Sequence, residues 1–199
     1  MNLTDMIAMV RKDLHDEDNN NYRWTDDELE RHIGRAVKEF SEQIPLPAKA
    51  TLATTADSRD VNVTSLEDRV TVEAVEYPTG ETPPRYCRFS IWGDTLTIVS
   101  GKEPDGSNCC VYYGALHTLD ADGSTIPAKY EDLIATGTCG YAVIGAAAGA
   151  INKVNAGGTT APEEFRLWGS ERLGMFQEKI KRLGRKNRVR AQELYEARD

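Results

Sequence analysis

The sequence predicts an α+β fold, in which a small helical bundle carries an inserted antiparallel β module. Apolar residues recur at helical spacing over the first 44 residues. Between about Lys49 and Leu119, short runs of alternating apolar and polar residues are separated by turns. Helical spacing then returns after Pro127. We therefore expect three core helices, a long C-terminal helix, and an inserted β-sandwich or curled sheet.

The 199 residues suit one domain with a sizeable insertion. We expect residues 1–48 to form an N-terminal helical hairpin, and 49–125 to form the β module. Residues 126–160 would hold the third helix and a flexible break, and 161–199 a long helix with a basic docking tail. No apolar run reaches the roughly 18 residues of a membrane span, so no membrane partner is expected.

The stretch "NYRWTDDELERHIGRAVKEF" contains the clearest helix start. Thr25 is a good N-cap and Glu28 stands three residues later, which is the spacing of a capping box. Trp24 and Leu29 are spaced as a hydrophobic staple across that cap. These four residues are the expected structural caps. The helix should end near Pro45, and an earlier helix should run from about Leu3 to Leu14.

The β module is expected to contain four or five short strands. "RVTVEAVEY" loses its alternation at Ala74 and Val75, which indicates a bulge. "YCRFSIW" reads as one strand with Cys87, Phe89 and Ile91 on the same face. A "GD" turn joins it to "TLTIVS", and "CCVYYG" forms a later strand.

The last two helices differ in character. The third, "YEDLIATGTCGYAVIGAAAGA", is rich in small residues, so we expect it to be buried and tightly packed on the first two helices. Thr160, Glu163 and Pro162 fit the start of the last helix. Its imperfect apolar stripe gives way to "GRKNRVRAQELYEARD", which has almost no apolar face. Such a tail cannot be stabilised by burial alone, so it either frays or docks on a partner.

No motif in the sequence indicates an enzyme. P-loop, GxSxG and HExxH patterns are absent, and "GAAAGA" follows helical rather than strand sequence. The four cysteines and three histidines lack metal-ligand spacing. The expected function is therefore structural, with no catalytic residue, cofactor or metal.

Charge is distributed unevenly along the chain, whose net charge is −8. Residues 1–30 hold nine acids against three bases, whereas residues 171–199 hold nine bases against five acids. The basic tail could be a solvated helix face, could dock on an acidic protein surface, or could contact phosphates without sequence preference. We expect docking to use ten positions, which are Lys179, Lys181, Arg182, Leu183, Arg185, Lys186, Arg188, Val189, Arg190 and Leu194.

The order of elements resembles the head-to-tail connector, or adaptor, proteins of tailed bacteriophages, also called head completion proteins. "YRWTDDELERHIGRAVKEFSEQIP" is similar to the W-[ST]-D-x-x-L start of that family's second helix. "STIPAKYEDLIATGTCGYAVIGAAA" is similar to its third helix, and the segments between them resemble a β-insert form of the family.

The resemblance implies a structural virion protein located at the head-tail junction and assembled in the bacterial host cytoplasm. Such proteins form a homo-oligomeric ring, usually of twelve copies, under the portal protein. The ring extends the channel for packaged DNA and offers a platform to the next tail or nozzle protein. A terminal helix commonly reaches up to embrace the portal, which would explain a last helix whose tail lacks an apolar face.

Two other functions remain open from the sequence. One is a non-enzymatic nucleic-acid-binding or DNA-packaging accessory protein that acts through the basic tail. The other is a carbohydrate- or ligand-binding β module, which rests only on Trp92, Tyr112 and Tyr113. Packing in the core of the module explains those aromatic residues better.

Overall fold

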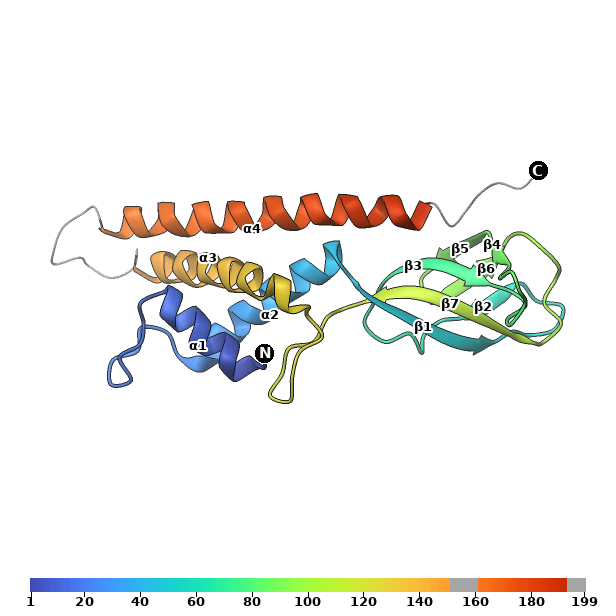
Figure 1. Cartoon of the computed structure of the whole chain (residues 1–199), viewed down its shortest axis with the longest axis horizontal. Coiled ribbons are helices and arrows are strands. Elements are labelled where there is room, and N and C mark those ends of the chain that lie inside the picture. Colours follow the sequence, from blue (N-terminus) through green and yellow to red (C-terminus); the bar gives the residue numbers. More distant parts are fainter. Residues whose placement is uncertain (151–160, 193–199) are drawn as a thin grey trace. The chain divides into compact units, whose positions relative to one another are not determined.

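A computed structural model describes residues 1–150 and 161–192, with side chains over 1–147 and 163–186. The chain divides into two compact units. Among the described residues, one unit contains 1–44, 117–150 and 161–184 and is helical, whereas the other contains 45–116 together with 185–192. The α+β class is confirmed, because a run of strands is inserted between helices (Figure 1).

The helical unit is built from α1 (Leu3–Asp13), α2 (Asp26–Gln43), α3 (Glu131–Ala150) and the part of α4 (Ala161–Gln192) up to Gly184. A short 3₁₀ turn, η1 (Ala128–Tyr130), leads into α3. The fully buried side chains at its centre include Met6, Leu29, Phe40, Ile134 and Phe176, which come from all four helices. One hydrophobic core therefore joins segments more than 100 residues apart in the sequence.

The first two helices begin where local capping chemistry places them. Asn2 caps α1, and its side chain and that of Asp5 each accept a hydrogen bond from the other residue's backbone N–H. Thr25 and Glu28 form the same reciprocal arrangement at α2. The cap expected at Thr160 lies outside the described residues.

Glycine residues set the distance between α3 and α4, which run side by side (Figure 1). A Cβ added at Gly137 would lie 2.8 Å from the Phe176 ring. One added at Gly140 would lie 2.9 Å from the backbone N of Leu173 and 3.1 Å from the carbonyl oxygen of Gly169. The expected tight packing of the third helix on α1 and α2 is therefore present, and α3 also packs closely against α4.

The β unit is a sandwich of two antiparallel sheets. One has the order β1 (Leu46–Ala53), β7 (Asn108–Ala115), β3 (Arg69–Glu76), β4 (Tyr86–Cys87). The other has the order β2 (Asp60–Asn62), β6 (Thr95–Ile98), β5 (Phe89–Trp92). Apolar side chains from both sheets fill the space between them, namely Val61, Leu96 and Ile98 from one and Val75, Cys87, Cys109 and Val111 from the other.

One expectation about the strands is wrong, and one strand was not predicted. The stretch 86–92 is not one strand, because β4 and β5 belong to different sheets and the chain changes sheet at Arg88. Ile91 is consequently exposed rather than aligned with buried Cys87. Leu46–Ala53 forms an unexpected strand that pairs with β7 along its whole length. Pro47 is tolerated there because β1 lies at the sheet edge.

The expected bulge in β3 is confirmed. The pairing of β3 with β7 shifts register between Arg69 and Thr71, and again between Val72 and Ala74. Because of the shift at Ala74, the consecutive side chains of Ala74 and Val75 are both almost fully buried.

Candidate functional site

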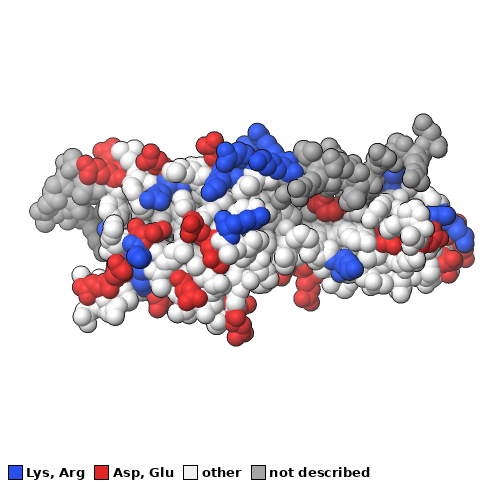
Figure 2. All heavy atoms as spheres, viewed as in Figure 1, with Lys and Arg blue, Asp and Glu red and all other residues white. Residues whose placement is uncertain are grey.

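Five exposed basic side chains follow one another on the C-terminal half of α4. This basic face consists of Lys179, Lys181, Arg182, Arg185 and Lys186. Figure 2 shows basic side chains gathered over α4. Among the described residues, no ion pair neutralises any of these five cations. The face is therefore available to an anionic partner.

The opposite side of the same helix is anchored to the bundle. Phe176 and Ile180 are buried in the helical core. A Cβ added at Gly184 would lie 2.9 Å from the carbonyl oxygen of Gln43, so the end of α2 and α4 approach closely there. This anchoring holds the basic side chains on the outer side of α4 up to Gly184.

The remaining docking positions expected from the sequence are placed less uniformly. Leu183 is half-buried and packs against the core of its own chain. Arg188, Val189 and Arg190 lie within α4, but their side chains are outside the described part. Leu194 lies beyond the described residues.

The capping residues connect the start of α2 to α3. The indole Nε1 of Trp24 donates to the carbonyl oxygen of Ala142 at 3.2 Å. Leu29 is completely buried one turn after the cap. The backbone N–H of Thr25 donates to Glu28 and lowers the pKa of that carboxyl below its usual value.

A buried arginine that the sequence did not reveal organises the loop before this cap. The Arg11 guanidinium donates to Asp16 and Asp26, at 2.7 Å each, and to the carbonyl oxygen of Trp24 at 2.9 Å. It also lies 3.5 Å from the centre of the Tyr22 ring. Charge, hydrogen bonds and stacking therefore hold the α1–α2 connection in place. The sequence signal for its burial is helical spacing, since Arg11 follows Ile7 by four positions and precedes Leu14 by three.

His117 performs a similar role where the chain returns from the β unit. Its Nε2 lies 3.1 Å from the carbonyl oxygen of Ile44, and its Nδ1 lies 3.0 Å from that of Thr125. Its backbone N–H donates to the Ser41 hydroxyl at 2.9 Å. Burial lowers the pKa of this histidine below its usual value.

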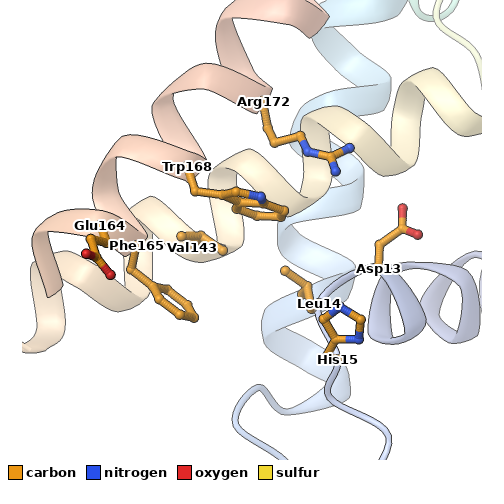
Figure 3. Close-up of a pocket in the computed structure, with 8 residues that line it drawn as sticks. All are labelled: Asp13, Leu14, His15, Val143, Glu164, Phe165, Trp168 and Arg172. Atoms are coloured by element: carbon orange, nitrogen blue, oxygen red, sulfur yellow. The ribbon is translucent and has the colours of Figure 1, made fainter. Parts of the chain in front are cut away.

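A cavity of about 400 Å³ opens between the end of α1, α3 and the first turns of α4. Figure 3 shows Phe165 and Trp168 projecting from α4 toward Leu14 and His15. Acidic and basic groups lie at its border, but among the described residues that line it no nucleophile is paired with a general base. Among the described residues no cluster of His, Cys, Asp or Glu could hold a metal ion.

The three aromatic residues of the β unit that were considered as a ligand-binding surface fall into two groups. Tyr112 is half-buried and its hydroxyl donates to Glu76 at 2.8 Å, and Tyr113 packs against the core of the sandwich. Trp92 is different, because 90% of it is exposed at the end of β5. The expectation that core packing explains all three residues is therefore wrong for Trp92.

Comparison with known proteins gives one family. The family model described as SU10 adaptor protein matches residues 1–193. No curated protein matches the chain. Among the described residues, no helix combines the length and apolar character needed to cross a membrane.

Proposed function

The chain belongs to the SU10 adaptor protein family, and we propose that it forms a ring beneath the portal that extends the DNA channel and joins head to tail. Membership supports the coarser statement directly: the protein is a structural adaptor of a phage virion and associates with other head or tail proteins. The portal, the ring and the channel are the finer parts of the proposal.

The observation that carries this proposal is the contrast between the two sides of α4. Phe176 and Ile180 fix the helix to the bundle, while the basic face has no anionic partner among the described residues. A folded helix that presents five exposed cations suits docking on an acidic protein surface. In this proposal the portal supplies that surface, with Arg188, Val189, Arg190 and Leu194 continuing the contact.

The β unit has a separate task in this proposal. It is inserted between Ile44 and His117, so it can vary without disturbing the helical core. Exposed Trp92 gives it an apolar side chain suited to contact with a tail or nozzle protein.

Electron microscopy of the protein mixed with the portal of the same phage tests the proposal. Three chains are compared: the full-length protein, a chain ending at Leu183, and a full-length variant with glutamine at the five positions of the basic face. The glutamine variant keeps the helix length, so it separates charge from truncation. Density capping the portal with the full-length protein alone supports both the ring and the docking role of α4.

Other outcomes would reject one part of the proposal and keep another, or reject the whole. Caps formed by all three chains would keep the ring and reject docking through α4. The absence of caps with any chain would reject the portal adaptor.

A second function, binding of nucleic acid through the basic face, is favoured by the same five exposed cations. Each phosphate contact contributes a slope of about −0.9 to the dependence of log affinity on log salt concentration. Duplex DNA binding that weakens steeply with salt, and that is lost in the five-glutamine variant, would favour this function over the adaptor role of α4.

A further inference from the structure

The outer side of the three-stranded sheet carries a regular array of side chains around Trp92. Val61 and Leu96 point into the core of the sandwich, and side chains alternate along a strand, so their neighbours point outward. Strand pairing arranges these outward residues in two rows, which are Asn62, Thr95 and Trp92, and Asp60, Thr97 and Ser90. Five of the six are exposed and Thr97 is half-buried. We call these six residues the outer face.

A fixed turn holds Trp92 at one end of this face. Gly93 and Asp94 form the turn that joins β5 to β6. The Arg69 guanidinium donates to the carbonyl oxygen of Gly93 at 3.1 Å and to the carboxylate of Asp94 at 3.4 Å. The backbone N–H of Val63 donates to the carbonyl oxygen of Asp94 at 2.9 Å. A side chain next to such an anchored turn loses little freedom when a ligand binds, so the indole ring is suited to act as a rigid platform.

Two polar side chains of the outer face are held in place by their own chain. The side-chain oxygen of Asn62 accepts a hydrogen bond from the backbone N–H of Thr64 at 2.8 Å, which leaves its NH₂ group as the donor offered to a ligand. One carboxylate oxygen of Asp60 accepts a hydrogen bond from the Thr97 hydroxyl at 2.6 Å, and the other oxygen can accept from a ligand. The face therefore offers an oriented donor and an oriented acceptor on the same strand.

The charges around this face favour an uncharged ligand. Asp60 is the one charged residue among the six. Arg88 and Val99 extend the pairing by one more row, since the backbone N–H of Val99 donates to the carbonyl oxygen of Arg88 at 2.8 Å, and Arg88 is exposed. One acid and one base leave this surface without net charge, and hydroxyl and amide groups supply most of its other polar atoms. A strongly charged partner would meet no complementary field here.

The surroundings of Trp92 favour a sugar over a protein. An aromatic anchor in a protein interface is typically surrounded by side chains that exclude water. Here the residue paired with Trp92 is Thr95, and Asn62 follows it across the sheet, so the ring is bordered by groups that form hydrogen bonds. A sugar ring matches this pattern, because one of its sides presents C–H groups to an aromatic ring while its hydroxyls need donors and acceptors beside that ring.

We propose that the outer face binds an uncharged polysaccharide, with one sugar ring stacked on Trp92. The Thr95 hydroxyl and the Asn62 NH₂ group bond to the hydroxyls of the stacked sugar. Asp60 lies in the second row, about 7 Å along the strand, and accepts from hydroxyls farther along the polymer.

The family supplies the setting for such a ligand. The chain belongs to a family of phage adaptors, and a virion meets polysaccharide on the surface of a bacterium. The inference gives the β unit a binding activity of its own and does not depend on the proposed ring. A tail or nozzle protein would then contact the β unit outside the outer face.

Isothermal titration calorimetry of the full-length chain with maltohexaose, xylohexaose and mannohexaose tests the inference. We expect at least one of these uncharged sugars to bind, and Trp92→Ala to weaken that binding at least about 10-fold because the platform is lost. Trp92→Phe keeps an aromatic ring and should retain more affinity than Trp92→Ala does.

A pair of threonines supplies the matched control. Thr95→Ala removes a hydroxyl beside Trp92 and should weaken binding by about 2- to 10-fold. Thr51→Ala removes an exposed strand threonine from the other sheet and should bind as the wild type does. Equal losses in the two variants would show that the outer face is not the site.

The absence of binding to all three sugars would overturn the inference, as would binding that Trp92→Ala leaves unchanged. Electron microscopy on portal rings keeps these outcomes separate from the proposed function. Trp92→Ala should cap the rings as the wild type does, because α4 carries that contact. Density of another virion protein over Trp92 in assembled particles would assign this residue to a protein partner and reject the polysaccharide.

Discussion

The inner and outer sides of α4 differ in their surroundings, since one packs against the helical core and the other faces solvent. On the inner side, Phe176 is fully buried against Gly137, and a Cβ added at Gly169 would lie 3.0 Å from a methyl carbon of Val143. On the outer side, Met175 and the basic face are exposed. Close packing of buried side chains stabilises the inner side, whereas the outer side carries exposed charged side chains. One helix can therefore be fixed to its own chain and still present a whole surface to partners.

Truncation of Phe176 should produce the largest effect on stability. Removing a fully buried aromatic ring costs about 3–5 kcal/mol, so Phe176→Ala should lower the free energy of unfolding by that amount. Met175→Ala, one residue away on the exposed side, should change it by less than about 0.5 kcal/mol. Urea unfolding followed by circular dichroism measures both. Equal losses in the two variants would contradict the distinction between the sides.

Alanine substitutions at two glycines, Gly140 and Gly174, should change the free energy of unfolding in opposite directions. Gly140→Ala places a methyl group 2.9 Å from Leu173, and such overpacking should destabilise the fold by about 1–3 kcal/mol. Gly174→Ala meets no neighbour, so its better helix propensity should stabilise the monomer by up to about 1 kcal/mol. Thermal unfolding at a concentration where the protein is monomeric distinguishes the two. A stabilising Gly140→Ala would show that α3 and α4 are farther apart than described.

Acidification should weaken the helical unit through its buried histidines. Burial is the largest cause lowering the pKa of both His32 and His117, so the folded state disfavours their protonation. The unfolded state binds more protons as the pH falls below about 6.5, and the free energy of unfolding must then decrease. Urea unfolding at several pH values should show this decrease between neutral pH and the lowered pKa values.

Substitution of the histidines identifies the source of that pH dependence. His32→Gln should reduce the slope, because it removes one buried titrating ring. His15→Asn is the matched control, since His15 is exposed and asparagine tolerates its positive φ of 53°. An unchanged slope in His32→Gln would assign the pH dependence to other groups.

Neutralisation of the basic face should have the smallest effect on folding. Lys181→Gln with Arg182→Gln removes two exposed cations that have no ion-pair partner among the described residues, so the free energy of unfolding should change by less than about 0.5 kcal/mol. The same variant should bind portal rings more weakly than the wild type does, and the difference between the two should be larger at low salt. Unfolding and binding measured on one preparation would separate the two roles, and a large loss of stability would mean that these side chains support the fold.

Features encoded by neighbouring residues could be predicted from the sequence. Thr25 and Glu28 cap α2 through contacts three residues apart, and the bulge at Ala74 follows from a broken alternation within one strand. The order of helices and the inserted sandwich follow from the change between helical and alternating spacing.

Features that depend on distant partners could not be predicted. The run Tyr86–Trp92 alternates continuously, and nothing within it marks the change of sheet at Arg88. Arg11 resembles any charged helix residue until the fold brings Asp16 and Asp26 to it. The exposure of Trp92 likewise depends on its place at the edge of a three-stranded sheet.

Hydrogen exchange of the full-length chain, free and bound to portal rings, most directly tests the claim that the outer side of α4 binds a partner. Exchange of backbone amides is read along α4 and along the β unit in both samples. The account predicts slower exchange on binding over residues 179–186, with little change in the buried turns of α3. Protection gained in the β unit alone, with α4 unchanged, would contradict it.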